Sequence, residues 1–215
     1  MSTIKVDTLN EKSTNGNIAV IPTGSGKLVL DGLTWPHADG SAGQIIKSNG
    51  SAVLSFIDAP SAGFTLGTEQ ATTSGTSFTF GSIPTGTTMI VIMFEGVSMN
   101  STNNMDITIG DAGGLETSGY RSNSINIEAG QSQSATNATS EFIVRSHSAS
   151  QDTTGTMVLS LKDSSDYTWI ETHVLLQDNT HVSFGGGRKS LSAELTQLQI
   201  SGGTFDAGSI NIMYM

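Results

Sequence analysis

Short apolar runs separated by turn residues characterise the first 60 residues of the chain. Between residues 31 and 58, runs of two or three apolar positions alternate with turn sequences such as Asp31-Gly32 and Ser48-Asn49-Gly50. Asp-Gly and Asn-Gly between apolar segments indicate tight turns. The pattern predicts short strands with a hairpin-like or solenoid-like rhythm around residues 17–35 and 44–57. Because isolated two-stranded hairpins are marginal in water, we expect the other copies of a homotrimer to cover these strands.

Longer apolar patterns begin near residue 64. Phe78 and Phe80 alternate with polar residues, residues 89–94 form a nearly continuous apolar run, and residues 210–214 alternate again. Two long apolar segments flank the turn residues 163–166 and predict a hairpin. About eight to ten strands at regular spacing are typical of an antiparallel β-sandwich or jelly roll.

Three segments are harder to interpret. The Gly-rich sequence at residues 181–191 predicts a loop, and the polar residues 130–140 predict a long loop that is either receptor-facing or flexible. Residues 189–201 carry leucines at both helical and strand spacing. In a chain of strands we favour a strand with a bulge near Thr196-Gln197 over a helix.

The small residues at 58–67 predict a domain boundary. Residues 1–60 are expected to form an N-terminal attachment or stalk region of short strands, and residues 61–215 a jelly-roll-like β-sandwich. The composition, with 25 glycines and only 13% charged residues, favours the same all-β fold class.

Charge and cysteine content exclude several functions. The net charge of −10, without a cluster of Lys and Arg, argues against a nucleic-acid partner. The absence of cysteine removes disulfides and thiolate metal sites. The first residues do not resemble a signal peptide, and the longest apolar run is too short for a membrane helix. We therefore expect synthesis in a cytoplasm.

Catalytic chemistry is weakly indicated. Paired carboxylates cleave polysaccharides in some enzymes; the candidates here are Asp106, Asp111, Glu116, Glu128 and Glu141. Asp163 and Asp166 are better explained as turn residues. The four histidines, His37, His147, His173 and His181, are expected at the surface or in an interface, although a ring of histidines on a threefold axis could hold a metal. The prediction is a non-enzymatic protein with no catalytic residue, cofactor or metal.

The sequence favours glycan contacts over catalysis. Tyr120-Arg121 after "ETSG", and Phe184 and Arg188 around "GGGRK", are expected in exposed loops. Aromatic rings stack on the faces of sugars, while arginine supplies directional hydrogen bonds. Trp35 and Trp169 are expected to be packing anchors instead.

Several segments, in this order, resemble the tail fibres of marine bacteriophages of the cyanophage type. These are "STIKVDTL", "ADGSAGQIIKSNGSAVLSF", "SIPTGTTMIVIMFEGVSMN", "ITIGDAGGLETSGY", "RKSLSAELTQLQI" and "GTFDAGSINIMY". The resemblance implies a trimeric virion appendage whose N-terminal part attaches to the particle and whose C-terminal β-domain meets the host surface. The short chain favours a short fibre or spike.

The resulting expectation is a homotrimeric tail fibre, assembled in the host cytoplasm, that mediates attachment to a host. Its expected partners are other tail or neck proteins and a host surface polysaccharide or outer-membrane component. Two alternatives remain: a purely structural neck, capsid or tail-adaptor appendage, and a monomeric carbohydrate-binding module.

Overall fold

The computed structural model describes residues 26–59, 63–128, 130, 133–146, 148–149 and 151–215. The chain is all-β: these residues form eighteen strands and no helix. The described part of the chain therefore contains no helix able to span a membrane. The chain divides into two compact units, Met1–Ala62 and Gly63–Met215.

The N-terminal unit contains two small antiparallel hairpins in its described residues. Strand β1 (Val29–Leu30) pairs with β2 (Leu33–Thr34), and β3 (Gln44–Ser48) pairs with β4 (Leu54–Asp58). Asp31 and Gly32 connect the first pair with φ values of 50° and 77°, as a tight turn of two left-handed residues requires. The expected hairpin at residues 44–57 is confirmed, whereas the pairing expected across residues 17–35 involves residues 17–25, which lie outside the described residues.

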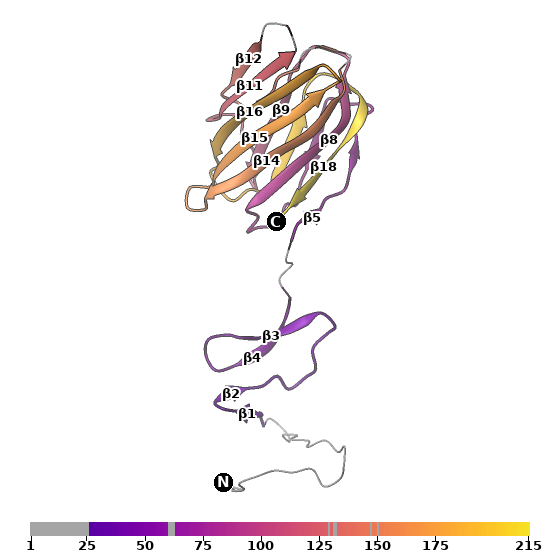
Figure 1. Ribbon diagram of the computed structural model, residues 1–215. Helices are drawn as coiled ribbons and strands as arrows, with labels where there is room; N and C mark the ends of the chain where they lie inside the picture. The colour runs from indigo at the N-terminus through magenta and orange to yellow at the C-terminus, as the bar shows by residue number, and fades with distance from the viewer. Residues whose placement is uncertain (1–25, 60–62, 129, 131–132, 147, 150) are drawn as a thin grey trace. The chain divides into compact units, whose positions relative to one another are not determined.

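The C-terminal unit consists of two antiparallel sheets that curl into a sandwich-like arrangement (Figure 1). The nine-stranded sheet has the order β12-β11-β16-β15-β14-β8-β18-β5, with β6 also paired to β18. Its strands are β5 (Thr65–Leu66), β6 (Gln70–Ala71), β8 (Met89–Met99), β11 (Arg121–Glu128), β12 (Ser134–Ala138), β14 (Thr153–Asp163), β15 (Thr168–Gln177), β16 (His181–Ser190) and β18 (Phe205–Tyr214).

The smaller sheet lies behind the larger one in Figure 1. It has the order β10-β9-β17-β7, and β13 also pairs with β9. Its strands are β7 (Ser77–Phe80), β9 (Met105–Asp111), β10 (Gly114–Leu115), β13 (Phe142–Val144) and β17 (Gln197–Ser201). The expected eight to ten strands are too few for this unit, because short strands such as β5 and β10 carry almost no apolar period.

The hydrophobic core lies between the two sheets. Alternate residues of the long strands point into it, so that Ile92 and Leu159 of the larger sheet and Ile107 and Ile200 of the smaller one are fully buried. Trp169 joins this core with 1% exposure, which confirms it as a packing anchor. The same prediction is wrong for Trp35 in a single chain, where the side chain is 37% exposed.

The predicted hairpin at residues 163–166 is confirmed. It joins β14 to β15, and the Oδ1 atoms of Asp163 and Asp166 accept hydrogen bonds from the backbone N–H groups of Ser165 and Thr168 at 2.9 and 3.1 Å. These bonds to nearby backbone groups are the expected turn chemistry of aspartate.

Two predictions about loops are wrong, and the bulged strand predicted at residues 189–201 forms only in its second half. Residues 181–190, including Gly185-Gly186-Gly187, form the continuous strand β16 between β11 and β15. Part of the polar segment 130–140 forms the edge strand β12. In residues 189–201, the chain leaves β16 after Ser190, crosses to the other sheet and begins β17 at Gln197, so that an irregular crossover replaces the first half of the expected bulged strand.

Candidate functional site

Tyr120 is not an exposed loop residue. Its side chain is 2% exposed, and its hydroxyl accepts a hydrogen bond from the backbone N–H of Ile109 at 2.9 Å and donates one to the carbonyl of the same residue at 3.2 Å. Its ring packs edge-on against Phe142, with 5.0 Å between the ring centroids. Burial raises the pKa of the Tyr120 hydroxyl. Tyr120 therefore belongs to the core, and its predicted place in a binding loop is wrong.

The other three predicted contact residues lie on one surface, although they are in strands and not in loops. Arg121 begins β11, while Phe184 and Arg188 belong to β16. All three are exposed, and they lie on the outer face of the nine-stranded sheet, opposite the core. The register of β11 and β16 places Arg121 directly opposite Arg188.

An apolar band crosses β11, β16 and β15 on this outer face. Directly paired residues on neighbouring strands point to the same side of a sheet. The register aligns Ile125, Phe184 and Val174 in one row across β11, β16 and β15, and Ile127, Val182 and Leu176 in the next row. Val174 is 63% exposed and Phe184 41%. An apolar patch of this kind marks an interaction surface on a folded protein.

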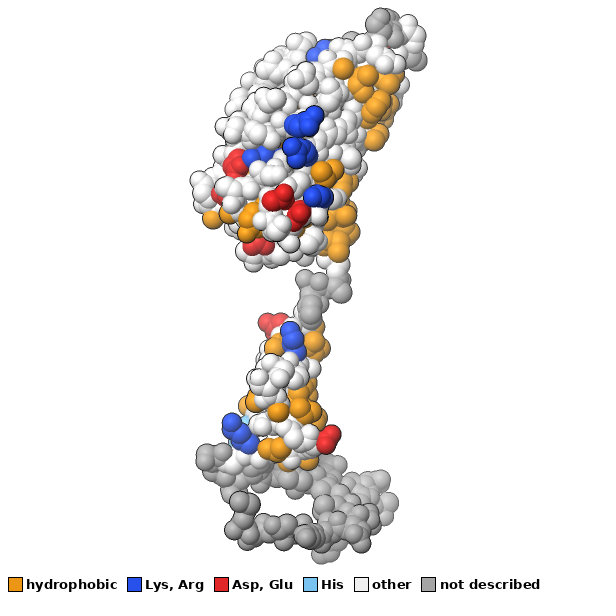
Figure 2. Space-filling model, turned by 90° about the vertical axis from the view of Figure 1, so that its left-hand side faces the viewer, with side chains coloured by type: hydrophobic (Ala, Val, Ile, Leu, Met, Phe, Trp, Pro, Cys, Tyr) orange, Lys and Arg blue, Asp and Glu red, His pale blue; other side chains and the backbone are white. Residues whose placement is uncertain are grey.

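A polar corner adjoins the apolar band, and we call it the arginine corner. It is formed by Arg121, Arg188, Asn123, Asn137, Thr139 and Gly186. All of these except Arg188 line a depression of about 350 Å³, together with Ser122 and Ala138. Figure 2 shows hydrophobic side chains along the right-hand edge of the C-terminal unit and Lys and Arg side chains on the adjoining face.

A larger depression of about 500 Å³ lies on the same sheet, over β8, β14 and β18. Glu69 and Glu95 line it together with apolar residues such as Leu66 and Met93. The described outer face thus carries carboxylates at one depression and the guanidinium group of Arg121 at the other.

Ser124, His173 and Glu171 form a hydrogen-bonded chain inside the sandwich. The Oγ atom of Ser124 lies 2.9 Å from His173 Nε2, and His173 Nδ1 lies 2.7 Å from Glu171 Oε1. Hydroxyl, imidazole and carboxylate follow one another as in a nucleophilic triad. However, all three residues are at most 2% exposed, and Ser124 Oγ also accepts a hydrogen bond from the backbone N–H of Arg145 at 3.0 Å. A substrate could reach Ser124 only if the sandwich opened.

This network corrects the expectation that His173 is a surface or interface residue. Its ring is fully buried, and its two nitrogens meet Ser124 and Glu171. Buried polar groups are tolerated when each finds a hydrogen-bond partner. Both ring nitrogens of His173 therefore have partners inside the sandwich, whereas Oε2 of Glu171 is buried without a hydrogen-bond partner among the described residues.

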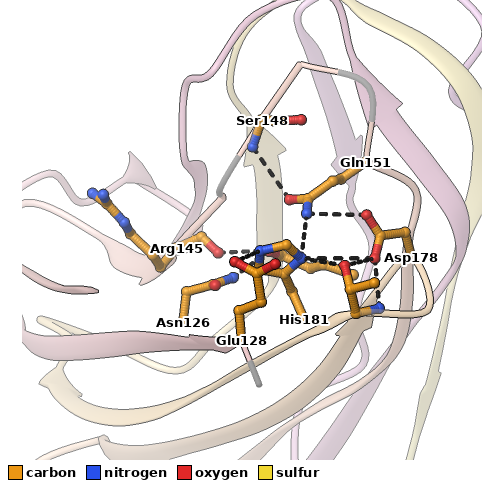
Figure 3. Close-up of polar contacts among 9 residues, drawn as sticks. Asn126, Glu128, Arg145, Ser148, Gln151, Asp178 and His181 are labelled. Atoms are coloured by element: carbon orange, nitrogen blue, oxygen red, sulfur yellow. Dashed lines mark hydrogen bonds and ion pairs between the residues drawn. The ribbon is translucent and has the colours of Figure 1, made fainter. Parts of the chain in front are cut away.

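A second polar cluster ties the end of the β15–β16 hairpin to the segment before β14 (Figure 3). His181 Nε2 lies 3.1 Å from Glu128 Oε2, while the amide nitrogen of Gln151 lies 2.8 Å from His181 Nδ1 and 3.1 Å from Asp178 Oδ2. The hydroxyl oxygen of Thr180 lies 2.7 Å from the same ring nitrogen, so Nδ1 of His181 meets both a side-chain amide and a hydroxyl. A hydrogen bond from the Thr180 hydroxyl holds the pKa of Asp178 below its ordinary value.

These contacts hold the β15–β16 turn against the segment before β14. His173 and His181 lie in different networks, and no group of three or more His, Asp or Glu among the described residues could hold a metal ion. His37 is exposed in the N-terminal unit, and His147 lies outside the described residues. The histidine ring on a threefold axis stays an untested alternative.

The candidate carboxylates are distributed over separate environments. Burial works to raise the pKa of Glu116, but the ammonium group of buried Lys189 binds it and holds the pKa below its usual value. A hydrogen bond from the Ser192 hydroxyl at 2.7 Å lowers the pKa of Asp111. Burial, with a contribution from nearby Glu141, raises the pKa of Asp106 to about 6. A raised pKa beside a second carboxylate is one requirement of an acid catalyst. However, neither Asp106 nor Glu141 lines one of the two depressions described above.

The sequence interpretation missed Asn123, Asn137, Thr139 and Gly186 as members of the arginine corner. The alternation of polar residues in "RSNSINIE" could have placed Asn123 beside Arg121 on one face of a strand. The chain is an all-β protein whose nine-stranded sheet exposes the arginine corner and the apolar band on its outer face. No protein-family model, curated protein or solved structure matches the chain.

Proposed function

We propose that the chain is a subunit of a homotrimeric bacteriophage fibre, or short spike, that attaches the particle to the host cell surface through glycan contacts. The N-terminal region, residues 1–60, would bind other tail or neck proteins. The C-terminal unit would present its binding face to a host polysaccharide or outer-membrane component. The assembled protein would be located in the virion, after assembly in the host cytoplasm.

The exposure of apolar side chains in the N-terminal unit carries this proposal. Ile45 and Ile46 of β3 are each 44% exposed in a single chain, and they are accompanied by exposed Val29, Leu30, Trp35 and Val53. Each described sheet of this unit has only two strands, so residues 26–59 supply no second layer to cover these side chains. Copies of the chain around a common axis would bury them, as the resemblance to fibres implies.

The C-terminal unit supports the second half of the proposal. It has its own core, and it exposes a polar corner and an apolar band on one sheet face. The chain also passes between the sheets repeatedly, for example from β16 to β17 and back to β18, which favours the finer description of a jelly-roll-like sandwich. Three such faces on one fibre would bind a repetitive surface with high avidity even if each site were weak.

Light scattering of the full chain tests the assembly. The expected mass is three times the 22.4 kDa of one chain. Ile46→Asp should reduce it, because the substitution places a charge on an apolar surface that the trimer buries. The matched control is Ser55→Asp, at an exposed polar position of the paired strand β4, and it should leave the mass unchanged. A monomeric wild-type chain would contradict the fibre proposal and favour a carbohydrate-binding module.

Binding of the labelled trimer to bacterial cells tests attachment separately. We expect saturable binding to cells of the host. A trimer that is found in virions but binds no host cell would favour the purely structural appendage. We propose no catalytic step for either arrangement.

A further inference from the structure

Arg121 and Arg188 are an unusual pair for a sheet surface. They are direct partners on neighbouring antiparallel strands and point to the same side, where like charges destabilise a sheet. No ion pair or side-chain hydrogen bond involves either residue within the described part of the chain, whereas Lys162 and Lys189 each meet a carboxylate. An arrangement that costs stability and has no partner in its own fold indicates a partner outside it.

The groups around the two arginines can bind sugar hydroxyls. Asn123 and Asn137 are direct partners on β11 and β12, and both border the depression with Thr139. Their amides and the hydroxyl of Thr139 can donate and accept hydrogen bonds. Gly186 contributes only backbone at the edge of the depression, so no side chain fills the space between Arg188 and Phe184.

Phe184 extends the site along β16. Arg188, Gly186 and Phe184 alternate on the outer face, and alternate residues of a strand are about 6.6 Å apart. Arg188 and Phe184, four residues apart, are therefore about 13 Å apart along the strand, a span that a short oligosaccharide can bridge together with the long arginine side chains. One unit would meet the guanidinium groups, and the next would place its apolar face on the ring.

We propose that the arginine corner binds an acidic saccharide, whose oxyanion lies between Arg121 and Arg188 and whose neighbouring sugar packs on Phe184. Guanidinium groups bind carboxylates and phosphates through paired, charge-assisted hydrogen bonds. A neutral saccharide would leave the two positive charges uncompensated and is discriminated against for that reason. The inference rests on the proposed attachment function and names the chemical class of its ligand.

Calorimetric titration of the full-length protein tests this proposal with three probes. These are tetragalacturonate, its neutral methyl ester and a phosphorylated mannan oligosaccharide. At least one acidic probe should bind, and the ester should bind at least about tenfold more weakly than tetragalacturonate if the oxyanion is a carboxylate. Binding of the phosphorylated probe alone would assign the oxyanion to a phosphate ester. No binding of either acidic probe, or equal binding of tetragalacturonate and its ester, would overturn the proposal.

Matched variants locate the site. Arg121→Gln and Arg188→Gln should each weaken binding of the acidic probe roughly tenfold or more, because each removes a charged hydrogen-bond donor. Lys162→Gln removes the same charge from an exposed position that is paired with Asp163, and it should leave the affinity unchanged. Phe184→Ala should weaken binding, whereas Leu66→Ala, at an exposed apolar position of the distant edge strand β5, should not. Equal effects of the site and control variants would contradict the assignment.

Cell binding separates this inference from the proposed function. If wild-type protein and both arginine variants bind host cells equally, attachment stands and acidic recognition at this corner is wrong. If the acidic probes bind and the arginine variants lose them, but wild-type protein binds no host cell, the saccharide site stands and the attachment proposal is wrong.

Discussion

Asp106 offers a direct test of the electrostatics of the sandwich. It lies on β9, with its side chain partly buried, and burial together with nearby Glu141 raises its pKa from 3.8 to about 6. At pH 7 the folded protein therefore holds a carboxylate in a place where ionisation is unfavourable. Replacement of this residue by asparagine, which is nearly the same size and has no charge, should stabilise the fold.

The magnitude follows from the shift in pKa. Each pKa unit corresponds to about 1.4 kcal/mol, so the rise from 3.8 to about 6 sets an upper limit of roughly 3 kcal/mol. Because the carboxylate keeps part of its contact with water, screening reduces this figure. We expect Asp106→Asn to increase the free energy of unfolding at pH 7 by about 1–2 kcal/mol.

The raised pKa of Asp106 determines how the stability changes with pH. Below pH 3.8 Asp106 is protonated in the folded and unfolded states, so its charge costs nothing and the variant has no electrostatic advantage. Between pH 3.8 and about 6 the folded state keeps a proton that the unfolded state has lost, so the wild-type protein loses stability as the pH rises. Above about pH 6 the disadvantage is constant. The gain from Asp106→Asn should therefore grow from pH 4 to pH 6 and then level off.

Urea unfolding at pH 4, 5, 6 and 7 measures this gain. A Trp35→Phe background leaves Trp169 as the single tryptophan, so that its fluorescence reports on the core of the C-terminal unit. Glu141→Gln is the companion variant: it removes the nearby negative charge and should also stabilise the protein at pH 7, by a smaller amount. A gain that is equal at pH 4 and pH 7, or a loss of stability at pH 7, would refute the reasoning.

Three further substitutions test the interior of the sandwich. Gly185→Ala should lower the free energy of unfolding by about 3 kcal/mol or more, because the new Cβ would lie 2.2 Å from the Asn123 carbonyl oxygen. Gly186→Ala, whose Cβ would have its nearest contact at 3.1 Å, should lower it less. Calorimetric melting measures both, and equal losses would contradict the close approach at Gly185. Tyr120→Phe should lower the free energy of unfolding by about 1–3 kcal/mol, because it removes two buried hydrogen bonds. It should leave the affinity for acidic saccharides unchanged. Weaker binding at unchanged stability would instead make Tyr120 a contact residue.

Local patterns were sufficient to predict much of the architecture. The alternation of Phe78 and Phe80, the long apolar run of β8 and the aspartates of the 163–166 turn each depend on residues close in sequence. Strand periodicity and turn chemistry act over a few residues, so the all-β class and the hairpins β3–β4 and β14–β15 could be inferred without tertiary information.

Strand β16 could not be predicted in this way. Three consecutive glycines lower strand propensity and indicate a loop. Their need for space arises from partners far away in the sequence: a Cβ at Gly185 would meet Asn123 of β11 and His173 of β15, and one at Gly187 would meet Phe142. The glycines are there because neighbouring backbone and side chains come close, and a single strand's sequence contains no sign of that approach.

The error at Tyr120-Arg121 shows how far a local pattern can define a binding site. Consecutive residues of an extended strand point to opposite faces, so Tyr120 and Arg121 could not both contact a ligand once the chain entered β11. The alternation "YRSNSINIE" already separates the two faces, with Tyr120, Ser122 and Ser124 buried and Arg121 and Asn123 exposed.

The pairing of Arg121 with Arg188 needs more than that alternation. The two residues are 67 positions apart, and they meet only because β11 and β16 are neighbours in a particular register. A slip of one residue in that register would turn one arginine toward the core and leave the other alone on the surface. Local sequence therefore determines which side of its own strand each arginine occupies, whereas the fold determines that they form one positively charged site. If the acidic-saccharide proposal is correct, the register of β11 and β16 creates the specificity of the site. Substitutions of the glycines at residues 185–187 that shift this register should then abolish binding, even though both arginines remain.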